Sequence, residues 1–388
     1  MLMKCVIIAA SVFFAASALS QEVPPVLSEA ITKIASDAPE NRVLNQLQAA
    51  TLALDLGRQE DAAQLFDDAL FGITSVYANN QQAADARSLW QNEGSKDFKG
   101  EPYERAMAFY YRGLLDMRAG DYENARASFK SAMLQDAFAE DAQHQTDFAL
   151  MMFLEGWCSH VLGSKSLADE AFAELAEFRP GFVRPAPDHN LLVIVETGKA
   201  PRKLQDGIGG NLLVYRQGKR FKEVGARAII GDETVMLTPM ESIYWQASTR
   251  GGRPVDGILE GQVQFKQNTE NVAATISGIA SEGALYAPLY GASNGAFAGV
   301  AAVAGLTTLM TSRVKTRADA RYWNNLPDMV HVYTMARPKD LQEIKIEFLN
   351  TAGAVLPEFS QSRKVIVDTK GRGLVWARAR RATDVDTK

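Results

Sequence analysis

The chain is poor in cysteine and histidine, the residues from which disulfides and many metal sites are built. Its 388 residues contain two cysteines and four histidines. Cys5 lies in the apolar amino-terminal segment, which leaves Cys158 alone and without a partner for an intrachain disulfide. The histidines are scattered over the chain: His144, His160, His189 and His331. We therefore expect a fold held by core packing, with no metal and no other cofactor.

The sequence also lacks an overall basic field. Its formal net charge is -5, which argues against a general nucleic-acid binder. The charge is distributed unevenly, because residues 21–180 hold 26 acidic and 13 basic residues, whereas residues 181–388 hold 20 acidic and 27 basic ones. An acidic first half followed by a basic second half predicts two units with different partners.

The amino terminus carries an apolar run that is too short to span a bilayer comfortably. Lys4 precedes the run, and the small residues Ala18 and Ser20 lie where a signal peptidase would cut. We expect residues 1–20 to be a signal peptide cleaved near Ser20, with an uncleaved anchor helix as the alternative. Cleavage there leaves Gln21 first, not the cysteine that a lipid anchor requires, so we expect a secreted protein without a lipid anchor.

From about Ser28 to Pro180 the sequence is rich in alanine, with apolar residues three and four apart, which predicts α-helices. One spacing occurs in it three times: a small residue, a glycine seven positions later, an alanine after five more and a phenylalanine after four more. The three sets are Ala50, Gly57, Ala62 and Phe66, then Gly113, Gly120, Ala125 and Phe129, and then Gly156, Gly163, Ala168 and Phe172. The spacing predicts helical hairpins, in which small residues let two helices approach and each glycine ends the first helix in a left-handed conformation. The phenylalanines are expected to fill the space between neighbouring hairpins.

These spacings resemble the tetratricopeptide repeat. The turn from Arg118 to Ala125 is a close match, whereas the first unit has Gln46 where an aromatic residue is usual and the third has Leu175 where the family prefers alanine. The corresponding glycines lie 63 and then 43 residues apart, so insertions interrupt the array. The resemblance implies a curved helical-repeat domain over residues 21–182 that binds a protein or peptide on its concave face.

On that resemblance, the first helix of each hairpin lines the groove. The lining residues are mostly apolar: Met107, Tyr110, Leu114, Met117 and Arg118 in the middle unit, and Leu150, Phe153, Trp157 and His160 in the third. Two interpretations remain open, since the same side chains could receive a partner or form an ordinary core against the second half of the chain. In both, the helical half is an interaction platform and not a catalytic centre.

After Pro180 the period changes, and short β-branched runs separated by turn residues predict strands. The expected strands cover residues 190–197, 211–215, 226–230, 234–238, 262–265, 330–333, 344–348, 363–367 and 374–379. The expected fold class is therefore α+β. An N-terminal all-α array of hairpins precedes a mostly antiparallel β-rich domain over residues 183–388.

One apolar segment interrupts the β-rich half, because residues 283–312 contain no charged residue. Gly291, Gly295 and Gly299 stand four apart and would form one smooth stripe on a helix, suited to close helix packing. The segment either packs as a buried helix within the fold, or enters a membrane or pairs with copies of itself. The second interpretation would make the protein a membrane-associated oligomer.

Catalytic motifs are largely missing. The sequence has no phosphate-binding Gly-x-x-x-x-Gly-Lys-Ser/Thr, no dinucleotide fingerprint and no His-Glu-x-x-His. Gly291 to Gly295 does fit the Gly-x-Ser-x-Gly string of serine hydrolases, with Ser293 as the nucleophile and Asp319 and His331 following in order. Its Gly/Ala-rich surroundings in an antiparallel context argue against that chemistry, so we expect no enzyme, with a hydrolase as the least favoured alternative.

A resemblance extends over most of residues 95–380. Lys-Gly-Glu-Pro-Tyr-Glu-Arg at 99–105, Gly-Lys-Ala-Pro-Arg-Lys at 198–203 and Ala-Asp-Ala-Arg-Tyr-Trp at 318–323 look like an uncharacterised family of Gram-negative envelope proteins. Its members combine tetratricopeptide-like helices with a β-rich carboxyl half. The resemblance implies a periplasmic location. We therefore expect a non-enzymatic periplasmic adaptor or scaffold that binds an envelope protein or peptide, in envelope assembly or maintenance.

Overall fold

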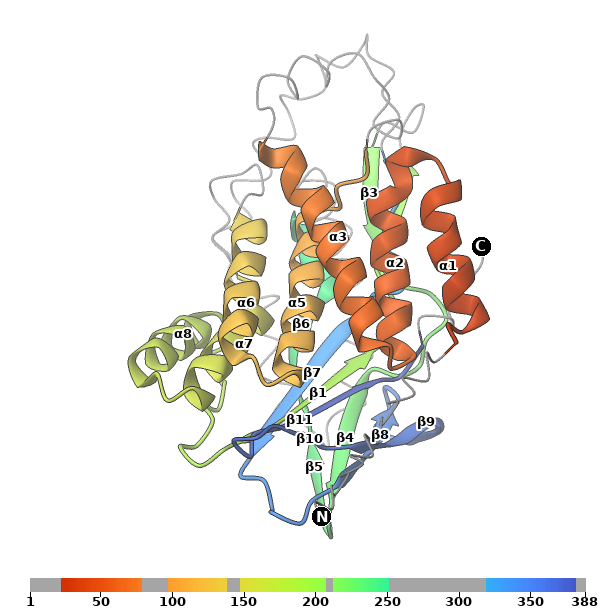
Figure 1. Ribbon diagram of the computed structural model, residues 1–388. Coiled ribbons are helices and arrows are strands. Elements are labelled where there is room, and N and C mark those ends of the chain that lie inside the picture. Colours follow the sequence, from red (N-terminus) through yellow and green to blue (C-terminus); the bar gives the residue numbers. More distant parts are fainter. Residues whose placement is uncertain (1–21, 79–96, 138–146, 207–211, 251–318, 382–388) are drawn as a thin grey trace, which may run out of the picture.

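The computed structural model describes residues 22–78, 97–137, 147–206, 212–250 and 319–381. Helices occupy the first half of the chain and sheets the second, as the α+β prediction requires (Figure 1). The signal peptide, Ser293 and the whole segment 283–312 with its three spaced glycines lie outside the described residues. No helix of the described residues has both the length and the hydrophobicity needed to cross a membrane.

The helices of the first half form a row of close pairs (Figure 1). Their bounds are α1 Pro25–Ser36, the short η1 Pro39–Asn41, α2 Arg42–Asp55, α3 Gln59–Ala78, α5 Pro102–Arg118, α6 Tyr122–Ala137, α7 Ala149–Val161 and α8 Lys165–Phe178. The start of α5 shows why a helix begins there: the side chains and backbones of Glu101 and Glu104 form a capping box, and Pro102 occupies the first turn. The pairs are α2 with α3, α5 with α6, and α7 with α8.

The spaced glycines have the conformations that the sequence predicts. Gly57, Gly120 and Gly163 follow α2, α5 and α7 with φ of 75°, 80° and 76°. The alanines and phenylalanines of the three sets are buried: Ala50, Ala62, Phe66, Ala125, Phe129, Ala168 and Phe172. The tetratricopeptide-like arrangement of these pairs stays a prediction.

Two of the three phenylalanine rings pack inside their own hairpins, whereas the sequence suggested the space between neighbouring hairpins. A methyl group on Gly113 would lie 2.7 Å from Cε1 of Phe129, and one on Gly156 would lie 2.6 Å from Cε1 of Phe172. Each ring therefore occupies the space that the glycine leaves inside its own hairpin, because only a residue without Cβ lets the ring come so close. Phe66 does reach the next pair, stacking on Tyr111 at 5.6 Å between ring centroids.

The second half forms two larger sheets and one hairpin. The strands are β1 Leu191–Thr197, β2 Arg202–Asp206, β3 Leu212–Arg216, β4 Gly225–Ile230, β5 Glu233–Met236, β6 Thr238–Ser242, β7 Met329–Met335, β8 Glu343–Leu349, β9 Val355–Lys364, β10 Ile366–Val367 and β11 Gly373–Arg378. A five-stranded sheet has the order β10-β11-β1-β7-β6, a four-stranded sheet the order β5-β4-β8-β9, and β2 pairs with β3. Among the described strands β1 and β11 alone run parallel, and a short helix, α9 (Ile243–Arg250), follows β6.

The molecule has three layers, with the five-stranded sheet in the middle (Figure 1). Successive side chains of a strand point to opposite faces, and β1 is buried along its whole length because both faces are covered. Leu192 and Ile194 belong to the core shared with the helices. Val193 and Val195 belong to the core shared with the four-stranded sheet. The middle sheet thus contributes to a core on each of its faces.

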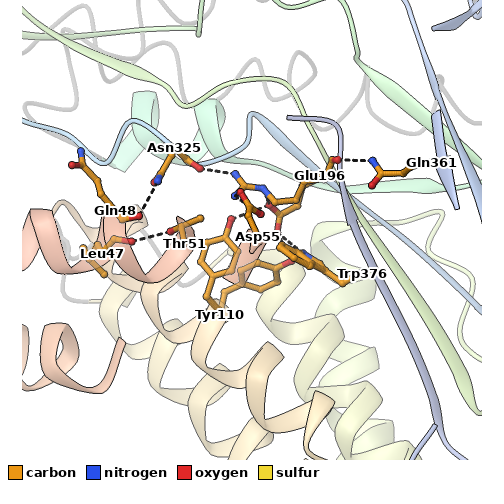
Figure 2. Close-up of polar contacts among 11 residues, drawn as sticks. Leu47, Gln48, Thr51, Asp55, Tyr110, Glu196, Asn325, Gln361 and Trp376 are labelled. Carbon is orange, nitrogen blue, oxygen red and sulfur yellow. Dashed lines mark hydrogen bonds and ion pairs between the residues drawn. The ribbon is translucent and has the colours of Figure 1, made fainter. Parts of the chain in front are cut away.

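A buried carboxylate joins the helical layer to the sheet. Glu196 at the end of β1 accepts hydrogen bonds at 2.9 Å from the hydroxyls of Tyr110 and Tyr111 on α5 and from Nε1 of Trp376 on β11 (Figure 2). Nε of Arg378 lies 2.9 Å from Oε2 of the same carboxylate. Burial raises the pKa of Glu196, and the arginine and the three neutral donors oppose that shift. The four donors satisfy a charge that is only 1% exposed.

Arg378 carries the same connection on to α2. Its guanidinium lies 3.2 Å from Asp55 at the end of that helix and also donates to the backbone oxygen of Asn325 (Figure 2). Burial alone would lower the pKa of Arg378, yet Asp55 and Glu196 raise it above its ordinary value. The arginine therefore stays charged between two acids that come from different layers.

Other contacts between the halves involve the segments that carry the envelope-family resemblance. Nζ of Lys203 on β2 lies 2.7 Å from Glu101 before α5, and both are largely buried. Glu104 accepts a hydrogen bond of 2.6 Å from the backbone N–H of Trp323. Burial raises the pKa of Glu104 to about 7. Segments 99–105 and 198–203 and the described residues 319–323 thus meet at one place between the helices and the sheet.

We predict that Glu196→Gln destabilises the folded protein by about 3 kcal/mol, because it leaves a buried arginine with one acid and removes acceptors from buried hydroxyls. Urea unfolding followed by circular dichroism measures this free energy. Asp169→Asn, which breaks exposed pairs with Lys165 and Arg184, is the control and should change stability by less than about 1 kcal/mol. Equal effects of the two substitutions would contradict the special role of Glu196.

Candidate functional site

The residues predicted to line a peptide groove lie in the core. Met107, Tyr110, Leu114, Met117, Leu150, Phe153 and Trp157 are buried, and Arg118 and His160 are half-buried. The apolar members share their core with side chains of β1, β7, β11 and α9. The face that the sequence suggested for a partner is therefore covered by the protein's own sheet. The sequence left two interpretations open. In the structure these side chains form a core against the second half of the chain.

Asp319 and His331, which the sequence offered as partners of Ser293 in a hydrolase, each contact a neighbouring side chain. Asp319 pairs with Arg321 at 2.7 Å. His331 on β7 is buried, its Nε2 lies 3.0 Å from the hydroxyl of Thr197, and burial lowers its pKa to about 3, which makes it a weak base. Among the described residues, no three His, Cys, Asp or Glu side chains are placed to hold a metal ion.

The structure instead shows a pocket of about 300 Å³ beside the Glu196 network. Its wall comes from the loop after β1, the start of β2, the loop after β3, the segment 322–326 and the end of β11 with the residues that follow. Half of its fourteen lining residues are basic: Lys199, Arg202, Lys219, Arg220, Arg378, Arg380 and Arg381. No aspartate or glutamate lines it. We call this site the cationic pocket.

Two of these arginines are held by buried acids behind the wall. Arg378 has Asp55 and Glu196 as described, and Arg380 forms an ion pair with Glu223, whose side chain is fully buried. These pairs fix the positions of the guanidinium groups before any ligand arrives. They also mean that Arg378 and Arg380 bring little net charge to the pocket.

Three other basic residues of the wall have no acidic partner in the described part of the chain. Nε of Arg202 donates to the backbone oxygen of Gln217 at 3.1 Å, and Lys219 and Arg220 take part in no ion pair. The positive potential of the pocket therefore comes mainly from Arg202 and from the loop that carries Lys219 and Arg220. An anion entering here would meet charges that the protein itself leaves uncompensated.

The backbone of that loop is unusual. Arg220 has φ of 58°, the one positive φ of a non-glycine residue in the described chain. An L-residue in this region costs roughly 1–2 kcal/mol, and such strain gathers at functional sites. At Gly218, a Cβ would lie 2.6 Å from the backbone oxygen of Lys199, so the loop after β3 lies directly on the loop after β1. Two basic loops are thus pressed together at one wall.

Asp328 anchors these loops from behind. Its carboxylate accepts a hydrogen bond of 2.8 Å from Nε2 of Gln217, and its backbone N–H donates to the oxygen of Thr197 at 2.8 Å. The other carboxylate oxygen is buried without a hydrogen-bond partner. Burial raises the pKa of Asp328 to about 7, and the charge of Glu223 adds to the shift. A neutral Asp328 is therefore the form that the fold prefers.

The cationic pocket presents mainly hydrogen-bond donors. Its wall offers guanidinium and ammonium donors, the amides of Asn324 and Asn325 and the ring of Tyr322, without a carboxylate, histidine or cysteine among its lining residues. Such a set of donors favours an anionic group. The sequence analysis did not identify this site and registered only the excess of basic residues after residue 180.

We predict that Asp328→Asn removes a pH dependence of stability. The folded protein binds the Asp328 proton more tightly than the unfolded chain, whose ordinary pKa is 3.8, so this stability is fully present below pH 3.8 and is lost as the pH rises through about 7. The variant keeps the bond to Gln217 and cannot ionise. At pH 8 its free energy of unfolding in urea should exceed that of the parent by about 2–4 kcal/mol. This difference should shrink toward pH 4. A gap that is constant over this range would contradict the raised pKa.

The chain was compared with protein-family models, with curated proteins and with solved structures, and it matches none of them.

Proposed function

We propose that this protein is a non-enzymatic binding protein of the cell envelope, an adaptor whose cationic pocket holds an anionic group of its ligand. One observation carries the proposal: half of the residues that line this pocket are basic and none is acidic. The envelope location rests on the expected signal peptide and on the family resemblance.

The charge of the pocket sets the class of ligand. Arg202, Lys219 and Arg220 lack acidic partners in the described chain, so a singly charged anion would leave part of their repulsion in place. A group with two or more negative charges would balance them. Arginine side chains suit phosphoryl and carboxylate groups in particular, because their N–H donors match two oxygens at once.

The size of the pocket limits what can enter. A volume of about 300 Å³ lies at the lower end of ligand sites in proteins. It accommodates a pyrophosphate, a small polycarboxylate or one charged ring of a larger molecule, with the remainder of that molecule outside. This suits an adaptor that recognises one group of an envelope component.

The fold supports binding without rearrangement. Arg378 and Arg380 are fixed by buried acids, and Gly218 holds the strained loop of Arg220 against Lys199. Because buried acids already hold Arg378 and Arg380, these two side chains lose little entropy when an anion binds. The strain at Arg220 is consistent with a residue kept for its charge and not for its backbone preference.

We predict that pyrophosphate and citrate bind the pocket, and that Arg220→Gly and Lys219→Ala each weaken binding about tenfold or more, since each removes a charged donor. Glycine accepts a φ of 58° freely, so Arg220→Gly should fold as well as the parent. Isothermal titration calorimetry at low salt measures the dissociation constants.

Lys339→Ala is the matched control, because Lys339 is exposed and lies outside the pocket. It should bind both anions within about twofold of the parent, and added salt should weaken binding to the parent steeply. If neither anion binds, or if the pocket variants bind as the parent does, the proposed function is wrong.

A further inference from the structure

The outer side of the helical layer carries a second recess, which differs from the cationic pocket in composition. Helices α6 and α8 each pack on α7, and α8 lies at the end of the helical row opposite α1 (Figure 1). A groove of about 290 Å³ lies between α6 and α8, with Glu155 of α7 contributing to its lining. We call it the α6–α8 groove. None of its lining residues comes from the sheets of the second half.

Half of the eight residues that line this groove are apolar. Met133 and Leu134 of α6 face Leu167 and Ala171 of α8 across it. The side chain of Leu134 is 57% exposed, although burial of a leucine stabilises by about 1.5–3 kcal/mol. Met133 and Leu167 are half-buried. An apolar side chain that entered the groove would cover these atoms.

The remaining lining residues are acidic, apart from one lysine. Glu155, Glu170 and Glu174 line the groove, and Lys130 lies 3.2 Å from Glu155. Glu170 and Glu174 are exposed and have no ion pair in the described chain. Burial and the charges of Glu155, Glu177 and Glu170 raise the pKa of Glu174, in that order. The negative charges at this groove therefore exceed what the protein supplies to balance them.

The acids of α8 stand in a row beside the apolar floor. Glu170 and Glu174 are four residues apart, as are Leu167 and Ala171, so each pair follows one face of the helix with a spacing of about 6 Å. A helix that carries leucines at three and four residues apart and lysines or arginines four apart has the complementary pattern. The acidic row would repel a phospholipid headgroup or a nucleic acid.

From this charge and shape we infer that the α6–α8 groove docks a basic amphipathic helical segment of a partner protein. The leucine-sized side chains of that segment cover Leu134, Met133 and Leu167, and its lysines or arginines pair with Glu170 and Glu174. This surface is separate from the cationic pocket. No other described part of the chain lines the groove, so it offers the helical half a docking face in place of the one that the sheet covers.

The test uses a synthetic peptide of about 14 residues, or four helical turns, with leucines at three and four apart and lysines at four apart. Fluorescence anisotropy of the labelled peptide measures its affinity for the full protein. We expect it to bind at least about tenfold more tightly than a scrambled peptide of the same composition and than a version with glutamate in place of lysine. Equal binding of the first two peptides would overturn the inference, since charge alone would then explain it.

Variants locate the binding surface. Glu170→Lys with Glu174→Lys should weaken binding about tenfold or more, and Leu134→Ser should weaken it severalfold. All three residues are exposed, so these changes should leave the unfolding temperature unchanged. Glu60→Lys, an exposed acid outside the groove, is the matched control and should stay within about twofold of the parent. If the control loses as much affinity as the double variant, the groove is not the site.

Two further measurements distinguish peptide docking from anion binding and from self-association. Lys219→Ala changes the cationic pocket and not the α6–α8 groove, so it should bind the peptide as the parent does. Failure of anion binding therefore leaves the peptide result unaffected, and the two proposals can fail separately. Sedimentation of the parent protein alone reports whether a second copy occupies the groove. Self-association that disappears in the Glu170→Lys and Glu174→Lys variant would assign the groove to a dimer and overturn the inference.

Discussion

The carboxylate of Glu196 is the constraint on which the arrangement of this molecule depends. It is buried at the end of β1, and its four donors come from α5 and β11, so its shell is complete only when the helices have packed on the sheet. A buried charge without its partners costs several kcal/mol, which makes separate folding of the two halves unfavourable. The same contacts fix Arg378, which forms part of the wall of the cationic pocket. The interaction that joins the layers thus also builds part of the site.

The features that the sequence predicted well are local ones. The glycines after α2, α5 and α7 and most strands of the second half follow from spacings within one hairpin or one run. What covers a face could not be read in the same way, because an apolar row such as Met107, Tyr110 and Leu114 has the same pattern whether a partner or the chain's own sheet lies on it. Strands β2 and β6 were missed for a related reason, and of β9 the strand predicted at 363–367 covered only the end. Arg-Lys-Leu-Gln-Asp and Thr-Pro-Met-Glu-Ser have little β-branched content, and their pairing partners supply the order instead.

The cationic pocket was beyond reach of the sequence because its charges come from separate places. Lys199 and Arg380 lie near each other only because β1 and β11 pair in parallel, although they are far apart in the chain. The pairing of β2 with β3 brings the third segment, with Lys219 and Arg220, onto the same wall. The composition showed an excess of basic residues in the second half of the chain. Only the topology shows that these residues gather at one pocket, where they make up half of the lining. The acidic excess of the first half is likewise partly gathered, on α7 and α8 at the α6–α8 groove.

The residues that carry the family resemblance have a role of their own in this arrangement. Glu101, Glu104, Lys203 and Trp323 meet one another where the helices join the sheet, and each is largely buried. Residues in such a position are constrained by packing and by the pairing of buried charges, whichever ligand the protein binds. A resemblance through such residues therefore says little about specificity. Specificity would reside in residues that those contacts leave free to vary, Lys219 and Arg220 at the cationic pocket and Glu170 and Glu174 at the α6–α8 groove. Two proteins with the same joint between helices and sheet could thus bind different ligands at both sites.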